Sequence, residues 1–246
     1  ESACAKLNEI VGAIHPERKS LDALTGETIR DTYADLVMSK NGSNEVTYFE
    51  PAVLTPPDHE NAAAHLKMFA EFMKDESNIV ANMRYRNPDR IQRTLVVIKP
   101  DNWRYPSSRP GTIIDMFSRT GLRIIACKLV QMSVNQALEF YGPVKEALKE
   151  RLAPVAGQQA RTVLANHFGF SLSENLGKCL EESFGIEYAN EQFYRIVEFM
   201  SGRRADQCTS EECNKPGKVK SMVLIYEGER AVEQIRSVLG PTDPTQ

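Results

Sequence analysis

The sequence predicts an α+β protein in which three short apolar strands alternate with amphipathic helices. Two observations lead to this prediction. Apolar runs that suit buried strands occur at residues 94–98, 122–132 and 219–226. Each run is followed by a stretch with helical apolar spacing that begins or ends at Pro, Ser or Gly. The order strand, helix, strand, helix, strand, helix indicates a small sheet with helices packed on one side.

The composition is that of an ordinary globular protein. The chain has 246 residues, of which 41% are hydrophobic and 26% charged, enough for one large or two small domains. A net charge of −3 disfavours nucleic acid as the main partner, because proteins that neutralise phosphates carry a basic excess. No run reaches the roughly 18 apolar residues that cross a bilayer. The five cysteines are too few and too scattered for a disulfide framework, so we expect a cytoplasmic protein.

Residues 1–92 predict a mainly helical region. Apolar residues recur at helical spacing over 7–14, 27–38 and 62–73, and Asp58 is the expected N-cap of the third helix. Turn and loop residues separate the second stretch from the third. Such stripes are typical of core packing, so this region indicates no chemistry of its own.

The first half of the predicted sheet follows. The strand at 94–98 ends at Lys99-Pro100-Asp101, and a helix then runs from Pro110-Gly111 to a C-cap at Gly121. After the strand at 122–132, Ser133 is the expected N-cap of a helix that contains Phe140 and Tyr141.

The remaining chain predicts helices, one loop and the last strand. Residues 142–190 form a charged helical stretch, and 193–200 an amphipathic helix. The polar loop 201–218 contains Cys208 and Cys213, which lack the further ligands of a zinc site. We interpret them as reduced thiols, with a local disulfide as the alternative in an oxidising compartment. The strand at 219–226 and a helix at 228–239 complete the pattern.

Three segments, in this order, resemble the nucleoside diphosphate kinase family. The first comprises residues 93–101, 111–114 and Gly121, the second Phe140-Tyr141 and 193–202, and the third 223–228 and 236–244. The resemblance therefore covers 93–141 and 192–244, while 1–92 and 142–190 have no counterpart in the compact family members. The loop after Lys99 is also longer than in the family.

The resemblance implies a ferredoxin-like sheet of four antiparallel strands, of which three are recognisable here. It divides the chain into a helical N-terminal region, 1–92, and a kinase-like domain, 93–246, which carries a helical insertion at about 142–190. Family members transfer the terminal phosphate of a nucleoside triphosphate to a histidine and then to a nucleoside diphosphate, with Mg²⁺ on the nucleotide. They assemble into dimers, tetramers or hexamers, so a homo-oligomer is implied.

Carried over position by position, the resemblance assigns roles to five residues. Lys99 is expected at the sugar hydroxyls and the transferred phosphate, and Tyr141 beside the phosphorylated histidine. Phe193 would stack on the base, while Arg236 and Thr242 would hold the phosphates; no residue is expected to bind metal directly. The ordinary alternatives are core aromatics for Phe193 and Tyr141 and solvated cations for Lys99 and Arg236.

The sequence departs from the family at its end. The family's last strand, with its Asn and its phosphate-accepting His, has no counterpart before Gln246. By motif, none of the four histidines takes this role: His15, His59, His65 and His167. We therefore expect an inactive piece of a longer phosphotransferase, whose phosphohistidine lies beyond the end of this chain. The alternative is a non-catalytic nucleotide-binding protein with a regulatory or scaffolding role.

Overall fold

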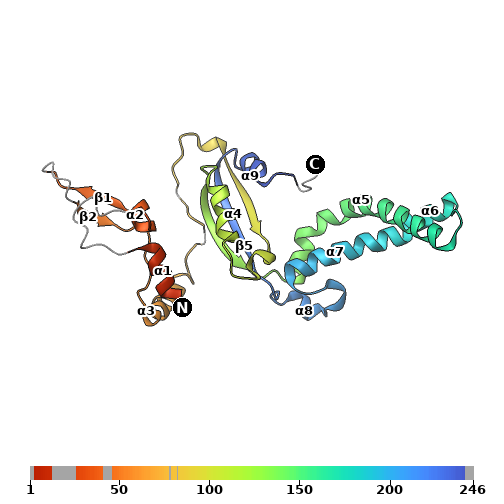
Figure 1. The fold of residues 1–246 in the computed structure, drawn as a ribbon, viewed down its shortest axis with the longest axis horizontal. Helices are drawn as coiled ribbons and strands as arrows, with labels where there is room; N and C mark the ends of the chain where they lie inside the picture. Colours follow the sequence, from red (N-terminus) through yellow and green to blue (C-terminus); the bar gives the residue numbers. More distant parts are fainter. Residues whose placement is uncertain (1–2, 13–25, 41–45, 78, 82, 242–246) are drawn as a thin grey trace. The chain divides into compact units, whose positions relative to one another are not determined.

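The chain divides into two units, Glu1–Ser77 and Asn78–Gln246, in a computed structural model (Figure 1). The structure describes residues 3–12, 26–40, 46–77, 79–81 and 83–241. The boundary lies earlier than the predicted one at 92/93, because the segment before the first strand is bonded to the sheet of the second unit. The Val80 amide donates to the Ile125 carbonyl (2.8 Å), and the Tyr85 hydroxyl to Glu227 Oε1 (2.7 Å).

The first unit contains three helices and a two-stranded antiparallel sheet: α1 (Ala3–Val11), α2 (Ile29–Tyr33), β1 (Asp35–Met38), β2 (Val46–Glu50) and α3 (His59–Phe72). The prediction of one helix over 27–38 is wrong, because Asp35–Met38 pairs with β2 and so satisfies its backbone groups in a sheet. Asp58 is confirmed as the N-cap of α3. The apolar stripe of α3 is not core, since Leu66 is 72% and Phe69 56% exposed.

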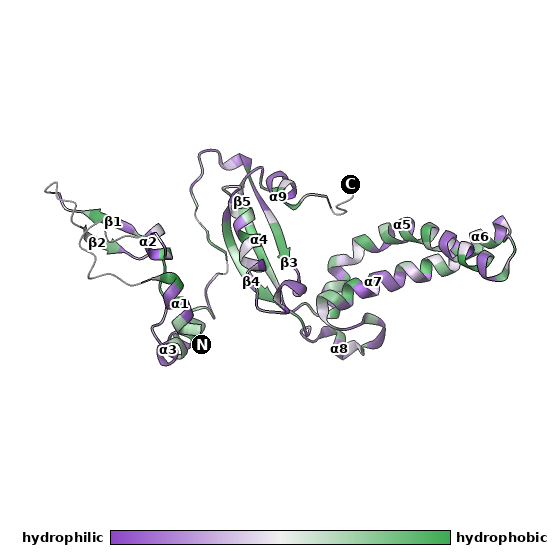
Figure 2. Ribbon diagram, in the orientation of Figure 1, coloured by the Kyte–Doolittle hydropathy of each residue, from purple (hydrophilic) through white to green (hydrophobic). Residues whose placement is uncertain are grey.

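The second unit is built on a three-stranded antiparallel sheet in the order β3-β5-β4, which confirms the three predicted strands and the α+β class. Their bounds are β3 (Ile91–Ile98), β4 (Arg123–Val130) and β5 (Ser221–Glu229). Alternate residues point to one face, where Val96, Leu224 and Tyr226 are buried. Figure 2 shows the largely apolar strands in green. The fourth strand implied by the resemblance has no counterpart in this sheet among the described residues.

Two predicted helices, α4 (Arg109–Ser118) and α9 (Ala231–Leu239), contribute Phe117, Ala231 and Ile235 to the same core. After β3, a short 3-10 helix at Pro100–Trp103 turns the chain away from the sheet. Another, at Pro88–Arg90, precedes β3. The core of the sheet thus fixes the end of β3, where Lys99 lies.

The helical stretch after β4 forms a long antiparallel pair (Figure 1). It comprises α5 (Val134–Phe168), α6 (Glu174–Leu180), a π-helical turn (Glu181–Gly185) and α7 (Ile186–Ser201). Ser133 and Gln136 form a capping box, which confirms the predicted start of α5. A Cβ on Gly157 would lie 2.6 Å from Glu181 Cα, so glycine permits the close approach of the two helices.

The segment between α7 and β5 contains two short helical segments, Ala205–Gln207 and α8 (Ser210–Asn214). It also contains a disulfide between Cys208 and Cys213, so the interpretation of these residues as reduced thiols is wrong. Cys213 lies in a second core beside Phe193 and Met200. The spacing of the two cysteines alone did not reveal that the chain folds back there.

No helix among the described residues is both long enough and apolar enough to cross a membrane.

Candidate functional site

A cavity of about 370 Å³ lies where β3 ends beside α5 and α7. Its polar and aromatic lining comprises Lys99, Tyr141, Tyr188, Gln192, Arg195 and Phe199. Leu148, Leu152, Ile196 and Met200 supply the apolar part of the wall. We call this space the Lys99 cavity.

Helical spacing brings the lining residues of α7 together. Tyr188, Gln192, Arg195 and Phe199 follow one another at intervals of four and three residues, so they share one face of the helix. Tyr141, Leu148 and Leu152 line the facing side of α5 in the same way. The close helix packing therefore creates the two long walls of the cavity.

Lys99 contributes to the wall of this cavity from the end of β3. It directly follows β3 with extended backbone angles, and Pro100 then begins the 3-10 helix. The side chain is exposed and forms no ion pair with another described residue. Its positive charge is therefore available to an anion.

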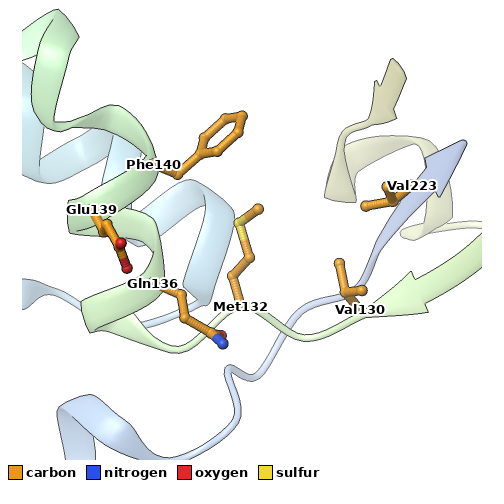
Figure 3. A pocket seen from close by; sticks show the side chains of 6 residues that line it. All are labelled: Val130, Met132, Gln136, Glu139, Phe140 and Val223. Atoms are coloured by element: carbon orange, nitrogen blue, oxygen red, sulfur yellow. The ribbon is translucent and has the colours of Figure 1, made fainter. Parts of the chain in front are cut away.

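Tyr141 supplies a half-buried hydroxyl. Burial raises the pKa of this phenol above its ordinary value, so the hydroxyl stays protonated at neutral pH and can donate a hydrogen bond. Its neighbour Phe140 faces elsewhere: it lines a separate hollow with Met132, Glu139 and Val223, between α5 and the sheet (Figure 3). Phe140 and Tyr141, which are adjacent in the sequence, therefore line two different cavities.

Phe193 does not fit the expected stacking role. Its ring is 2% exposed and packs with Val134, Val197 and Met200, and Lys145 Nζ lies 5.5 Å from the ring centre. The predicted helix was right, but Phe193 points to its core side. The exposed aromatic groups of this region are Tyr188 and Phe199 instead.

The structure does not bring Arg236 to Lys99. Arg236 lies on α9 and lines a different hollow with Gln92, Arg230 and Glu233. Thr242 lies outside the described residues. Of the five predicted site residues, only Lys99 and Tyr141 share a cavity.

The described histidines, His59, His65 and His167, do not line the Lys99 cavity. His167 is near the end of α5, where its ring packs edge-on against Phe168. His15 lies outside the described residues.

Arg195 is the functional candidate that the sequence analysis missed. Its Nε donates to Glu191 Oε1 (2.8 Å), and Arg204 binds the same carboxylate. These hydrogen bonds lower the pKa of Glu191 to about 2, so the carboxylate is ionised across the physiological range. Counting helical positions back from Phe199 would have placed Arg195 and Gln192 on the exposed face next to it.

The fold and the cavity together define an α+β protein with a lysine, an arginine and two aromatic rings at the end of its sheet. The family model of nucleoside diphosphate kinase matches residues 92–150. Nucleoside diphosphate kinase of Pyrobaculum aerophilum is 27% identical over 154 residues, which cover 63% of this chain and 69% of that protein. The enzyme of Nitratiruptor sp. is 46% identical over 56 residues, 23% of this chain and 39% of its own. Over residues 92–150 the chain is therefore similar to nucleoside diphosphate kinases.

A solved structure of an NDP kinase from Pyrobaculum aerophilum is similar to 63% of the chain, with a TM-score of 0.37 and 24% identity. The match to the family model also passes residue 142, where the insertion was predicted to begin, and reaches residue 150. This agrees with α5, which continues through Pro143 and Pro154 without a break. For relatives such as the Nitratiruptor enzyme, the chain spans less than two-fifths of their length.

Proposed function

We propose that the Lys99 cavity binds nucleoside di- and triphosphates and that the chain forms the nucleotide-binding part of a phosphotransferase. The observation that carries the proposal is the meeting of Lys99 and Tyr141 with Arg195 in a cavity that also holds Tyr188 and Phe199. The similarity of residues 92–150 to nucleoside diphosphate kinases supports the same substrate class.

The two cations act on the phosphates in this proposal. Lys99 has no acidic partner among the described residues. Arg195 donates through Nε to Glu191, and its η nitrogens form no hydrogen bond with a described residue. Charge-assisted hydrogen bonds from such groups contribute about 1.5–3 kcal/mol each. The Tyr141 hydroxyl donates a further hydrogen bond to a phosphate oxygen.

The aromatic groups act on the base. Phe199 is 43% and Tyr188 40% exposed, so each can offer part of a ring face. Stacking tolerates different bases, because every base has a π-face. We therefore propose that the cavity accepts both adenine and guanine nucleotides.

Transfer itself proceeds, in this proposal, by attack of a neutral histidine nitrogen on the terminal phosphorus. The nucleoside diphosphate leaves, and the phosphohistidine then gives its phosphate to a second nucleoside diphosphate. None of the described histidines lines the cavity, so we place the accepting histidine in the part of the protein that the structure does not describe. Lys99 would stabilise the charge on the phosphate as it moves.

Magnesium is assigned to the nucleotide rather than to the protein. The residues that line the Lys99 cavity include no carboxylate, whereas phosphate oxygens are ligands that Mg²⁺ prefers. When bound, the ion would neutralise phosphate charge. We further propose a homo-oligomer, which light scattering of the purified chain would test.

Calorimetric titration of the chain with ADP, GDP and adenosine tests the binding proposal. Lys99→Ala and Arg195→Ala should each weaken ADP and GDP about tenfold or more and leave adenosine unchanged. Arg119→Ala is the matched control, since Arg119 is an exposed cation paired with Asp115 on α4. If both cavity variants bind ADP within twofold of the unaltered chain, the proposal is wrong.

The absence of a described histidine from the cavity also favours a second candidate, a nucleotide-binding protein with no transfer activity. The chain alone should exchange no phosphate between ATP and GDP above background. Binding without exchange by the full-length gene product would establish this second candidate. An acid-labile phosphohistidine on His15, His59, His65 or His167 during turnover would instead show that our site is misplaced.

A further inference from the structure

A second cavity, of about 580 Å³, lies beside the 3-10 helix that follows Lys99. Its charged lining comprises Asp101, Arg104, Glu198, Lys218 and Lys220, and its aromatic lining Trp103 and Phe199. We call this space the Trp103 cavity. It shares Phe199 with the Lys99 cavity but none of the charged residues.

The charges of the Trp103 cavity are unbalanced. Asp101 lies 4.0 Å from Arg109, and Glu198 lies 3.8 Å from Arg204, which also binds Glu191 and Asp206. In contrast, Arg104, Lys218 and Lys220 form no ion pair with any described residue. The lining therefore holds three unpaired cations against two carboxylates, and its charge is net positive.

The segments that carry these cations are anchored. The Lys218 amide donates to the Ser201 carbonyl (2.7 Å), and the preceding Gly217 is packed so tightly against Met132 and Ser201 that a Cβ there would clash with their backbone. Lys218 and Lys220 flank the partly buried Val219 just before β5, and both line the cavity. Because the backbone is already held, an anion could bind here without ordering a loop.

Trp103 is anchored as well. Its indole Nε1 donates to the Ile98 carbonyl (3.4 Å), and the ring packs against the core of the sheet. The ring also lines the cavity, where it lies with Phe199. The space thus offers cations and apolar ring surface together.

We infer that the Trp103 cavity is a second anion-binding site, which takes a ligand with two or more linked phosphate groups. The inference rests on the charges of this cavity alone and holds whether or not the chain transfers phosphate. The polyphosphate could be free or part of a nucleotide, whose base would then contact Trp103 and Phe199.

Fluorescence of Trp103 gives a direct readout, because it is the one tryptophan of the chain. We would titrate sodium tripolyphosphate, pyrophosphate and ADP separately at constant ionic strength, since exposed charges are screened by salt. Each titration should give a saturable change in emission. A tighter constant for ADP than for pyrophosphate would identify a nucleotide as the ligand, and equal constants a phosphate chain alone.

Variants test whether the fluorescence change comes from the Trp103 cavity. Lys218→Ala/Lys220→Ala should weaken the binding of tripolyphosphate tenfold or more. Lys178→Ala/Lys215→Ala removes two exposed lysines outside the cavity and should leave the constant within twofold. Lys99→Ala should also leave it within twofold, although it weakens ADP at the Lys99 cavity.

Three results would overturn the inference. The first is the absence of both a saturable change in emission and binding heat. The second is an equal loss of tripolyphosphate affinity in both double-lysine variants. The third is a loss of affinity in Lys99→Ala as large as that in Lys218→Ala/Lys220→Ala, which would show that the two cavities act as one site. Failure of the nucleotide proposal would give another result. Lys99→Ala would then bind ADP as tightly as the unaltered chain, while tripolyphosphate would still change the emission of Trp103.

Discussion

Phe193 and Phe199 lie on one helix but have opposite roles. Phe193 is almost wholly buried, so Phe193→Ala should lower the free energy of unfolding by about 3–5 kcal/mol through the cavity it leaves. Phe199 is 43% exposed and lines the Lys99 cavity. Phe199→Ala should change stability far less and weaken ADP and GDP by similar factors, at about 1–3 kcal/mol for lost stacking.

Urea unfolding and nucleotide titration of the two variants, side by side, check this contrast. The assignment of the two rings would be reversed if Phe193→Ala folded normally and lost nucleotide binding while Phe199→Ala did not.

Glu191 gives the site region a defined response to acid. Hydrogen bonds from Arg204 and Arg195 hold its pKa at about 2, below the value of about 4.3 for a free glutamate. A carboxylate with a lowered pKa in the folded state stabilises the fold above its unfolded pKa, and this contribution is lost as the pH falls through the folded value. Glu191→Gln should therefore lower the free energy of unfolding at pH 6. As the pH falls, this variant should lose less of its free energy of unfolding than the unaltered chain does.

Urea midpoints measured from neutral pH down to the folded pKa would test this response. Glu146→Gln is the control, because the exposed Glu146 has one ion pair, with Lys149. Identical pH profiles for Glu191→Gln and the unaltered chain would rule out the proposed role of the arginine contacts.

At the same scale, the structure brings two predicted site residues, Lys99 and Tyr141, to one cavity and buries a third, Phe193. Lys99 follows a strand and precedes Pro100, so local sequence sets its position at the sheet end. The side to which Phe193 points depends on the phase of α7 against α5, which a resemblance in sequence does not specify. Arg195 was missed for the same reason.

Among the elements, the helix pair depends on glycine at its closest approach. Gly157 and Gly142 both lie in α5, but only Gly157 faces another helix: a Cβ there would lie 2.6 Å from Glu181 Cα, whereas nothing lies within 4 Å at Gly142. Gly157→Ala should destabilise the chain by about 1–3 kcal/mol through overpacking and weaken nucleotide binding. Gly142→Ala should be neutral or stabilising by up to about 1 kcal/mol, because alanine favours the helix.

Thermal unfolding and ADP titration of both variants would measure this difference. Equal effects of the two substitutions would show that the close approach of α5 and the π-helical turn does not support the cavity.

The strands were predictable because their signal is local. Alternation and apolar runs identified β3, β4 and β5, and the caps Ser133 and Asp58 marked helix starts. The helix predicted over 27–38 failed because Asp35–Met38 finds its partners in β2, a pairing between separated segments. Pro143 and Pro154 disfavour a continuous helix, yet α5 runs through both.

For the whole molecule, the sequence predicted the similarity to nucleoside diphosphate kinases, and the two units divide at an earlier residue than the one predicted. The second unit begins at Asn78 because Val80 and Tyr85 bond to the sheet, and these contacts leave no periodic signal in the sequence. The family match likewise runs into the stretch that had been expected to be an insertion. The account of the second unit therefore centres on one claim, that nucleotide binds between the end of β3 and the α5–α7 pair.

A crystal structure of the chain soaked with ADP tests that claim most directly. We expect the diphosphate within hydrogen-bond distance of Lys99 and Arg195, the Tyr141 hydroxyl on a phosphate oxygen, and the adenine against Tyr188 or Phe199. Density for ADP beside Arg236 on α9, with the Lys99 cavity empty, would contradict the account.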